Sequence, residues 1–92
     1  MKLLWSENAW EDYFYWQQSD REVLRRVNTL LREIQRSPFK GIGKPEPLRG
    51  DLVGWWSRRI TGDHRIVYRA RGTGEEQQLE IIACRYHYLS KR

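Results

Sequence analysis

Hydrophobic and polar positions follow a helical pattern up to Ser37 and a strand pattern after it. In the N-terminal part, apolar residues recur about every three to four positions, which is typical of helices that bury one face. In the C-terminal part, aromatic and β-branched residues alternate with polar ones, which is typical of strands. Residues 2–6 predict one further strand before the helices. The pattern predicts an α+β fold in which two N-terminal helices pack on one face of a small, mostly antiparallel, twisted sheet.

The two helices are predicted from their capping residues and their apolar faces. Ser6 can cap the first helix, and Ser19-Asp20-Arg21-Glu22 has the pattern of a capping box that opens the second. The aromatic residues of the first helix are predicted to be core: Trp10, Tyr13 and Phe14, broadened by Tyr15 and Trp16. The second helix carries an amphipathic stripe of Val23, Leu24, Val27, Leu30, Leu31 and Ile34. It ends at Ser37-Pro38, because a residue before proline avoids the helical region.

A loop over residues 39–51 contains the segment Lys44-Pro45-Glu46-Pro47. The two prolines restrict the backbones of Lys44 and Glu46 to extended conformations, and this orients the Glu46 carboxylate in advance. Rigid loops on a scaffold often carry catalytic groups. A stiff connector with a solvated glutamate is the alternative.

Residues 55–68 predict a β-hairpin around Thr61-Gly62-Asp63. Side chains of the first strand alternate between two faces, with Trp55, Ser57 and Arg59 on one and Trp56, Arg58 and Ile60 on the other. At least one of Arg58, Arg59 and Arg65 therefore points towards an otherwise apolar face, where a cation is costly unless it has a partner. A phosphate is one such partner, and an internal carboxylate is the other candidate.

The last strand is predicted over residues 78–86, close to the end of the chain. Within it, Cys84 has no base nearby in sequence and is predicted to be a small buried hydrophobe. His64 lies at the hairpin turn and could simply be solvated. Two histidines and one cysteine at scattered positions lack the spacing of metal ligands, so no metal and no cofactor are expected.

Length and composition indicate one domain over residues 1–92, since so short a chain seldom holds two cores. The single cysteine excludes an internal disulfide framework and suits a reducing compartment. No apolar run has the length of a signal peptide or a membrane span. We therefore expect a soluble, cytoplasmic protein.

The net charge of +5 is unevenly distributed along the chain. Residues 1–37 hold six basic and six acidic side chains, whereas residues 38–92 hold eleven basic and six acidic ones. This asymmetry points to a polyanion, most simply nucleic acid, that meets the C-terminal sheet. A basic surface that is only solvated is the alternative.

Glu46, His87, several arginines and a cluster of tyrosines together fit metal-independent cleavage of RNA. In that reaction a base takes the proton of the ribose 2′-hydroxyl, whose oxygen attacks the adjacent phosphorus. An acid protonates the departing 5′-oxygen, and fixed cations stabilise the phosphorane. DNA lacks the 2′-hydroxyl, so this chemistry selects RNA.

Four segments of the chain resemble the YoeB toxins of the RelE superfamily. They are Met1-Lys2-Leu3-Leu4-Trp5-Ser6, Gly43-Lys44-Pro45-Glu46-Pro47-Leu48, Trp56-Ser57-Arg58-Arg59-Ile60-Thr61 with His64-Arg65-Ile66-Val67-Tyr68, and Ala83-Cys84-Arg85-Tyr86-His87-Tyr88. The resemblance covers the chain, in order, to Tyr88. It implies a RelE-like fold and a ribosome-dependent endoribonuclease, an mRNA interferase, that cuts mRNA in the ribosomal A site and so inhibits translation.

The resemblance also implies a role for each matching residue. Glu46 matches the general base, His87 the general acid, Arg65 the residue that stabilises the transition state, and Tyr88 the tyrosine that positions the nucleotide. Lys44 and Arg59 match basic residues near the scissile phosphate, and Arg58 is expected to join them in binding RNA. Residues 89–92 form a short extension beyond the family's terminal tyrosine, which could shift Tyr88.

The implied partners are a cognate YefM-type antitoxin, the 70S ribosome and mRNA. The antitoxin would inhibit the toxin, and the complex of the two would bind operator DNA and repress its own operon. A membrane partner is not expected. The family likeness is compatible with a homodimer, but no residue of the sequence distinguishes a homodimer from a monomer. Two alternatives stay open: a translation inhibitor that binds RNA or the ribosome without cutting, and a protein whose basic groove mainly holds an acidic antitoxin segment.

Overall fold

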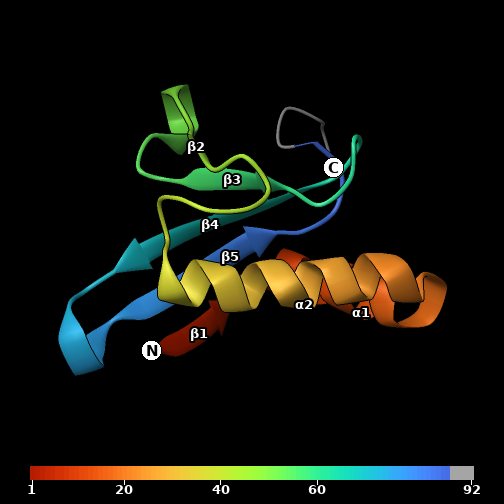
Figure 1. Ribbon diagram of the computed structural model, residues 1–92, viewed down its shortest axis with the longest axis horizontal. Helices are drawn as coiled ribbons and strands as arrows, with labels where there is room; N and C mark the ends of the chain where they lie inside the picture. Colours follow the sequence, from red (N-terminus) through yellow and green to blue (C-terminus); the bar gives the residue numbers. More distant parts are fainter. Residues whose placement is uncertain (88–92) are drawn as a thin grey trace.

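The computed structural model of the chain describes residues 1–87, in which one five-stranded sheet carries two helices on one of its faces (Figure 1). In chain order the elements are β1 (Lys2–Trp5), α1 (Glu7–Ser19), α2 (Arg21–Arg36), β2 (Glu46–Pro47), β3 (Trp56–Arg59), β4 (Arg65–Arg71) and β5 (Gln78–Ala83). Short 3₁₀ turns cover Gly50–Leu52 and Gly74–Glu76. Tyr88 and the extension over 89–92 lie outside the described residues.

The strands are ordered β1-β5-β4-β3-β2 across the sheet. β1 pairs in parallel with β5, and the other three pairs are antiparallel. The predicted α+β class, the mostly antiparallel sheet and the edge position of the first strand are therefore confirmed. The loop predicted over residues 39–51 differs in one respect, because Glu46–Pro47 forms a short edge strand against β3.

The core lies between the sheet and the two helices. The apolar stripe of α2 is confirmed, with Val27, Leu30 and Ile34 completely buried. From the sheet, Ile66 and Ile81 belong to the same cluster and are also completely buried. Burial of these side chains on one helical stripe and one sheet face is what holds the layers together.

The core prediction for the first helix is confirmed for two of its five aromatic residues, because Trp16 is buried and Tyr13 packs, partly buried, against the core. Trp10 and Phe14 are each 49% exposed, whereas Ala9, Asp12 and Trp16 face the sheet. Size and spacing alone therefore predicted only part of the buried face of this helix. Trp10 instead packs edge-on against Trp5, with ring centroids 5.7 Å apart.

Capping is confirmed for the first helix and corrected for the second. The Ser6 side chain accepts a hydrogen bond from the Ala9 N–H. The cap of α2 is Asp20 and not Ser19, because α1 continues through Ser19 and leaves one residue between the helices. The Asp20 carboxylate accepts hydrogen bonds from the main-chain N–H groups of Glu22 and Val23 in the first turn of α2.

Arg58 is the arginine that points into the core. Its side chain is completely buried on the helix-facing side of β3. The partner of its charge is neither a phosphate nor a carboxylate, because the guanidinium donates to the main-chain carbonyls of Ser37, Lys40 and Ile42. Its Nε also donates to the Tyr68 hydroxyl over 3.1 Å. The expectation that Arg58 contacts phosphate is therefore wrong for this structure.

Tyr68 extends this network to the end of α2. Its hydroxyl donates to the Pro38 carbonyl over 2.6 Å while it accepts from Arg58. Burial raises the pKa of Tyr68, and the neighbouring Arg58 only partly offsets that effect. The two side chains together fix the segment from residue 37 to residue 42, which leads into β2.

We predict that Arg58→Met lowers the free energy of unfolding by about 2–4 kcal/mol, because several buried carbonyls lose their donor at once. Chemical denaturation measures this loss. Arg59→Met is the matched control, since the Arg59 side chain is exposed on the other face of the same strand. Equal losses in the two variants would contradict the structural role assigned to Arg58.

Candidate active site

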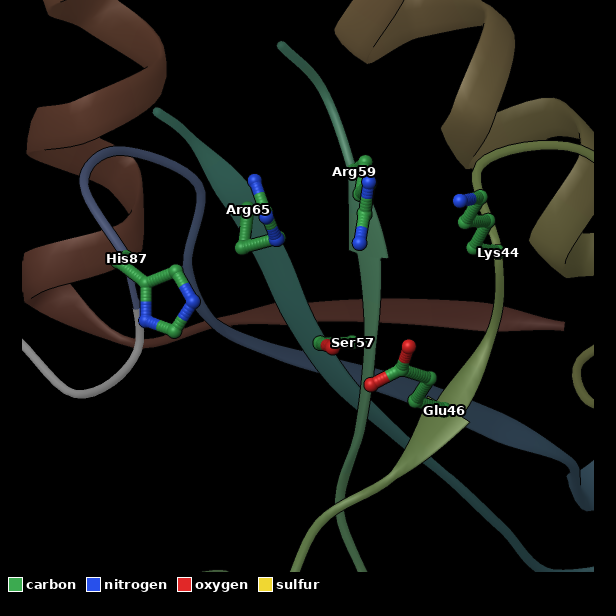
Figure 2. Close-up of a pocket in the computed structure, with 6 residues that line it drawn as sticks. All are labelled: Lys44, Glu46, Ser57, Arg59, Arg65 and His87. Carbon is green, nitrogen blue, oxygen red and sulfur yellow. The ribbon is translucent and has the colours of Figure 1, made fainter. Parts of the chain in front are cut away.

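A cavity of about 150 Å³ lies on the sheet face opposite the helices (Figure 2). Its lining residues are Lys44, Glu46, Ser57, Arg59, Arg65 and His87. Five of these are residues that the sequence singled out, and Ser57 is the addition. Figure 2 shows Glu46 and Lys44 on the β2 side, His87 on the segment that follows β5, and the two arginines on the strands between them.

Strand register brings the residues of β2, β3 and β4 to one place. Glu46 lies directly opposite Ser57, and Arg59 lies directly opposite Arg65. Ser57 and Arg59 are two residues apart on β3 and so share a face. The Glu46 carboxylate therefore has Arg59 as its diagonal cross-strand neighbour, within reach of long side chains.

Glu46 is held in extended backbone, as the flanking prolines predict. The extended backbone predicted for Lys44 is wrong, because Lys44 has a φ of 52° in the left-handed region. Here the chain must turn from Gly43, whose carbonyl accepts from the Arg59 N–H over 2.7 Å, into the short strand β2. Gly43 itself has a φ of 82°, and a Cβ there would lie 2.9 Å from Leu30, so this turn requires glycine.

Arg65 is fixed by the hairpin turn that precedes it. Only 9% of its surface is exposed. Its Nη1 donates to the carbonyls of Thr61, Gly62 and His64 over 2.8, 3.1 and 3.1 Å. Because all of its side-chain hydrogen bonds within residues 1–87 use Nη1, the Nε–Nη2 edge is the part of the guanidinium that a ligand can meet.

The segment that carries His87 leaves the sheet earlier than predicted. β5 ends at Ala83 rather than at residue 86. Cys84 is completely buried, as predicted, and both polar groups of its main chain form hydrogen bonds with side chains of α1. Its N–H donates to the Asp12 carboxylate over 3.0 Å, and its carbonyl accepts from the Trp16 indole over 2.8 Å.

The main chain of Tyr86 forms two hydrogen bonds in the same way, with residues of the hairpin. Its N–H donates to His64 Nδ1 over 2.7 Å, and its carbonyl accepts from the Arg65 N–H over 3.0 Å. The interpretation of His64 as simply solvated is therefore wrong. His64 is partly buried, and its ring meets the Trp16 ring edge-on at 4.8 Å. These contacts determine where the next residue, His87, lies.

Sequence reasoning missed three residues that build this site. Ser57 could have been found, because alternation already put it on the face of Arg59. Asp12 gave a weaker signal, as a carboxylate on a helix with an apolar face. His64 gave none, because nothing in the sequence indicates that its ring meets a main-chain N–H 22 residues away.

The charges around the cavity favour an anion. Three cationic side chains, Lys44, Arg59 and Arg65, surround the single carboxylate of Glu46. No group of three or more histidine, cysteine, aspartate or glutamate side chains within residues 1–87 is arranged to hold a metal ion. A carboxylate, an imidazole and fixed cations around one small cavity are the groups that acid–base chemistry at a phosphodiester requires.

Comparisons with known proteins show which protein family the chain belongs to. A profile of the family described as "YoeB-like toxin of bacterial type II toxin-antitoxin system" matches residues 5–88. The chain belongs to the YoeB family of type II toxins. Toxin YoeB of Escherichia coli K12 is 51% identical over 88 residues, which are 96% of this chain and 100% of that protein.

Comparison with solved structures supports the same family assignment. The YoeB/ParE toxin from Agrobacterium tumefaciens is 53% identical with a TM-score of 0.91, over 96% of this chain and 100% of that one. YoeB of Staphylococcus aureus was solved as a dimer, with 42% identity and a TM-score of 0.82. It was also solved in a heterotetrameric YoeB–YefM complex, with 40% identity and a TM-score of 0.84. Both comparisons cover 96% of this chain and 98% of the other. The RelE-like fold that the resemblance implied is thereby confirmed.

Neither helix within the described residues has the length and apolar character needed to cross a bilayer.

The ionisation of His64 provides a test of the site's packing. Burial lowers its pKa from the ordinary value of 6.5, opposed by Asp63 and Asp12 and assisted by Arg85 and Arg65. The folded state therefore favours the neutral ring. The stability that this provides is complete above pH 6.5 and is lost as the pH falls through the lower, folded-state pKa.

We predict that acidification from about pH 8 to about pH 5 lowers the free energy of unfolding of the wild type more than that of His64→Asn. Asparagine keeps an acceptor near the Nδ1 position but does not titrate. Urea denaturation of both proteins across the pH range measures the difference. Parallel stability curves would contradict the assigned ionisation.

Proposed function

We propose that this toxin is a ribosome-dependent endoribonuclease that cleaves mRNA in the A site and so stops translation. The observation that carries the proposal is the cavity in which Glu46 and His87 meet three cationic side chains. The family relationship supports a toxin, and the cavity supports the chemistry by which it would act.

Glu46 is proposed as the general base and His87 as the general acid. Glu46 takes the proton of the ribose 2′-hydroxyl, and the 2′-oxygen forms a bond to the adjacent phosphorus. The bond from phosphorus to the 5′-oxygen breaks, and His87 supplies a proton to that oxygen. The products are a 2′,3′-cyclic phosphate and a 5′-hydroxyl, with no water and no metal consumed in this step.

The basic residues are proposed to stabilise the transition state. Arg65 is held by three carbonyls through Nη1, so its remaining edge meets the phosphorane without reorganisation. Arg59 and Lys44 bind the phosphate from the β2 side of the same cavity (Figure 2). Tyr88 follows His87 directly and is proposed to stack on a base, which positions the nucleotide.

The partners are proposed from the family. A YefM-type antitoxin binds and inhibits the toxin, as the YoeB–YefM complex of S. aureus suggests by analogy. The complex then binds operator DNA and represses its own operon. A homodimer is proposed on the same basis, since YoeB of S. aureus forms one in its structure. The 70S ribosome and mRNA are the proposed targets.

The alternative is a translation inhibitor that binds RNA or the ribosome without cutting. The basic character of the cavity fits that function as well, because phosphate contacts alone give affinity. Only the pairing of a carboxylate with an imidazole in one cavity favours cleavage over simple binding.

We predict that Glu46→Gln and His87→Gln each lower the rate of mRNA cleavage by about 10²–10⁴-fold, the usual contribution of a general base or acid. Primer extension on ribosome-bound message measures new 5′ ends. Glu75→Gln is the matched control, because Glu75 is an exposed glutamate in the turn before β5 and should cut at the wild-type rate. Stalled ribosomes that carry full-length message would contradict cleavage and support the alternative.

We predict that a message with a single 2′-deoxynucleotide at the cut site is bound but not cut there, because the attacking oxygen is missing. The 3′ ends of the products from unmodified message should carry a 2′,3′-cyclic phosphate, which end-group analysis detects. Cleavage at the deoxy position would contradict the proposed attack by the 2′-oxygen.

A further inference from the structure

His64 holds the residue that precedes His87. Its Nδ1 accepts the Tyr86 N–H over 2.7 Å, and its ring centroid is 4.8 Å from that of Trp16 and 5.9 Å from that of Tyr86. The imidazole therefore links α1 to Tyr86. His64 does not line the cavity, so any effect on the reaction must act through another residue.

The backbone of Tyr86 needs such support. Its φ of 66° lies in the left-handed region, which residues other than glycine seldom adopt without help from their surroundings. Both main-chain groups of Tyr86 have partners from the hairpin: His64 accepts from its N–H, and the Arg65 N–H donates to its carbonyl. Turning the chain at Tyr86 is what brings His87 to the cavity.

We propose that His64 is a positioning residue, whose Nδ1 holds Tyr86 in its left-handed conformation and so directs the His87 imidazole into the cavity. The proposal rests on the proposed function, in which His87 is the general acid. It adds a second histidine that takes no part in proton transfer to RNA but determines where the acid lies.

The chemistry of the contact requires a neutral ring. A nitrogen that accepts a hydrogen bond carries no proton, so His64 is protonated on Nε2 alone. Protonation of Nδ1 would turn two donors towards each other and break the bond. The charged groups that face the ring are Asp12 from α1, Asp63 and Arg65 from the hairpin, and Arg85 from the chain end. Burial outweighs the two carboxylates and keeps the ring neutral.

A purely structural role makes a different prediction. If His64 only fills space against Trp16, a leucine of similar size should serve. If the acceptor matters, an asparagine should serve, because its Oδ1 lies where Nδ1 lies in histidine, and leucine should fail. Asparagine and leucine have nearly the same shape, so the pair isolates the acceptor.

The first arm of the experiment is cleavage of ribosome-bound mRNA by the wild type, His64→Asn and His64→Leu. We expect His64→Leu to lower kcat by about 10–100-fold, because misplacement of a reacting group by about 1 Å costs up to 10²-fold. KM should change little, since the phosphate-binding side chains are untouched. His64→Asn should restore most of kcat, and its activity should persist at lower pH than that of the wild type.

The second arm needs no substrate. In ¹⁵N-labelled wild-type protein, the Tyr86 amide and His64 Nδ1 should show a coupling across their hydrogen bond. The Tyr86 amide should exchange slowly in the wild type and in His64→Asn, and fast in His64→Leu. The ring signals of His87 should broaden or shift in His64→Leu alone.

The two arms separate this inference from the proposed function. Absence of the coupling, or equal kcat in His64→Leu and the wild type, would overturn the positioning role. Equal losses in the asparagine and leucine variants would also overturn it, because the acceptor would then not matter. If the wild type cuts no RNA, the proposed function fails. The coupling and the exchange of the Tyr86 amide then decide whether His64 holds the chain end.

Discussion

Four hydrogen bonds to the main chain of Cys84 and Tyr86 determine where His87 lies. Two come from α1 and two from the hairpin between β3 and β4, so both layers of the fold hold this segment. The ladder of β5 has already ended at Ala83 and no longer supports it. Without these bonds His87 would belong to a loose tail, and the cavity would have its carboxylate but no imidazole.

The opposite side of the cavity depends on a buried guanidinium. Arg58 binds three carbonyls of the segment after α2, and this segment leads through Gly43 into the short strand that carries Glu46. Its neighbour Arg59 points to the other face of β3 and lines the cavity. Strand alternation thus gives two adjacent arginines different tasks: one supports the fold and the other meets the ligand.

Periodicity predicted most of the buried faces, although it wrongly placed Trp10 and Phe14 in the core, and the sequence missed the features that depend on contacts with distant main-chain groups. The stripe of α2 and the two faces of the hairpin follow from spacing alone, and so does the grouping of Ser57 with Arg59. The carbonyl partners of Arg58 could not be predicted, because they belong to a loop without a periodic pattern. The contact of His64 with a distant N–H could not be predicted for the same reason.

In the proposed reaction Glu46 is the base and His87 is the acid at one phosphodiester. Replacing the 5′-bridging oxygen at the cut site by sulfur tests this directly, because a thiolate leaves without being protonated. We expect the sulfur substrate to restore cleavage by His87→Gln to near the wild-type rate and to leave cleavage by Glu46→Gln slow. Rescue of both variants, or of neither, would contradict these roles.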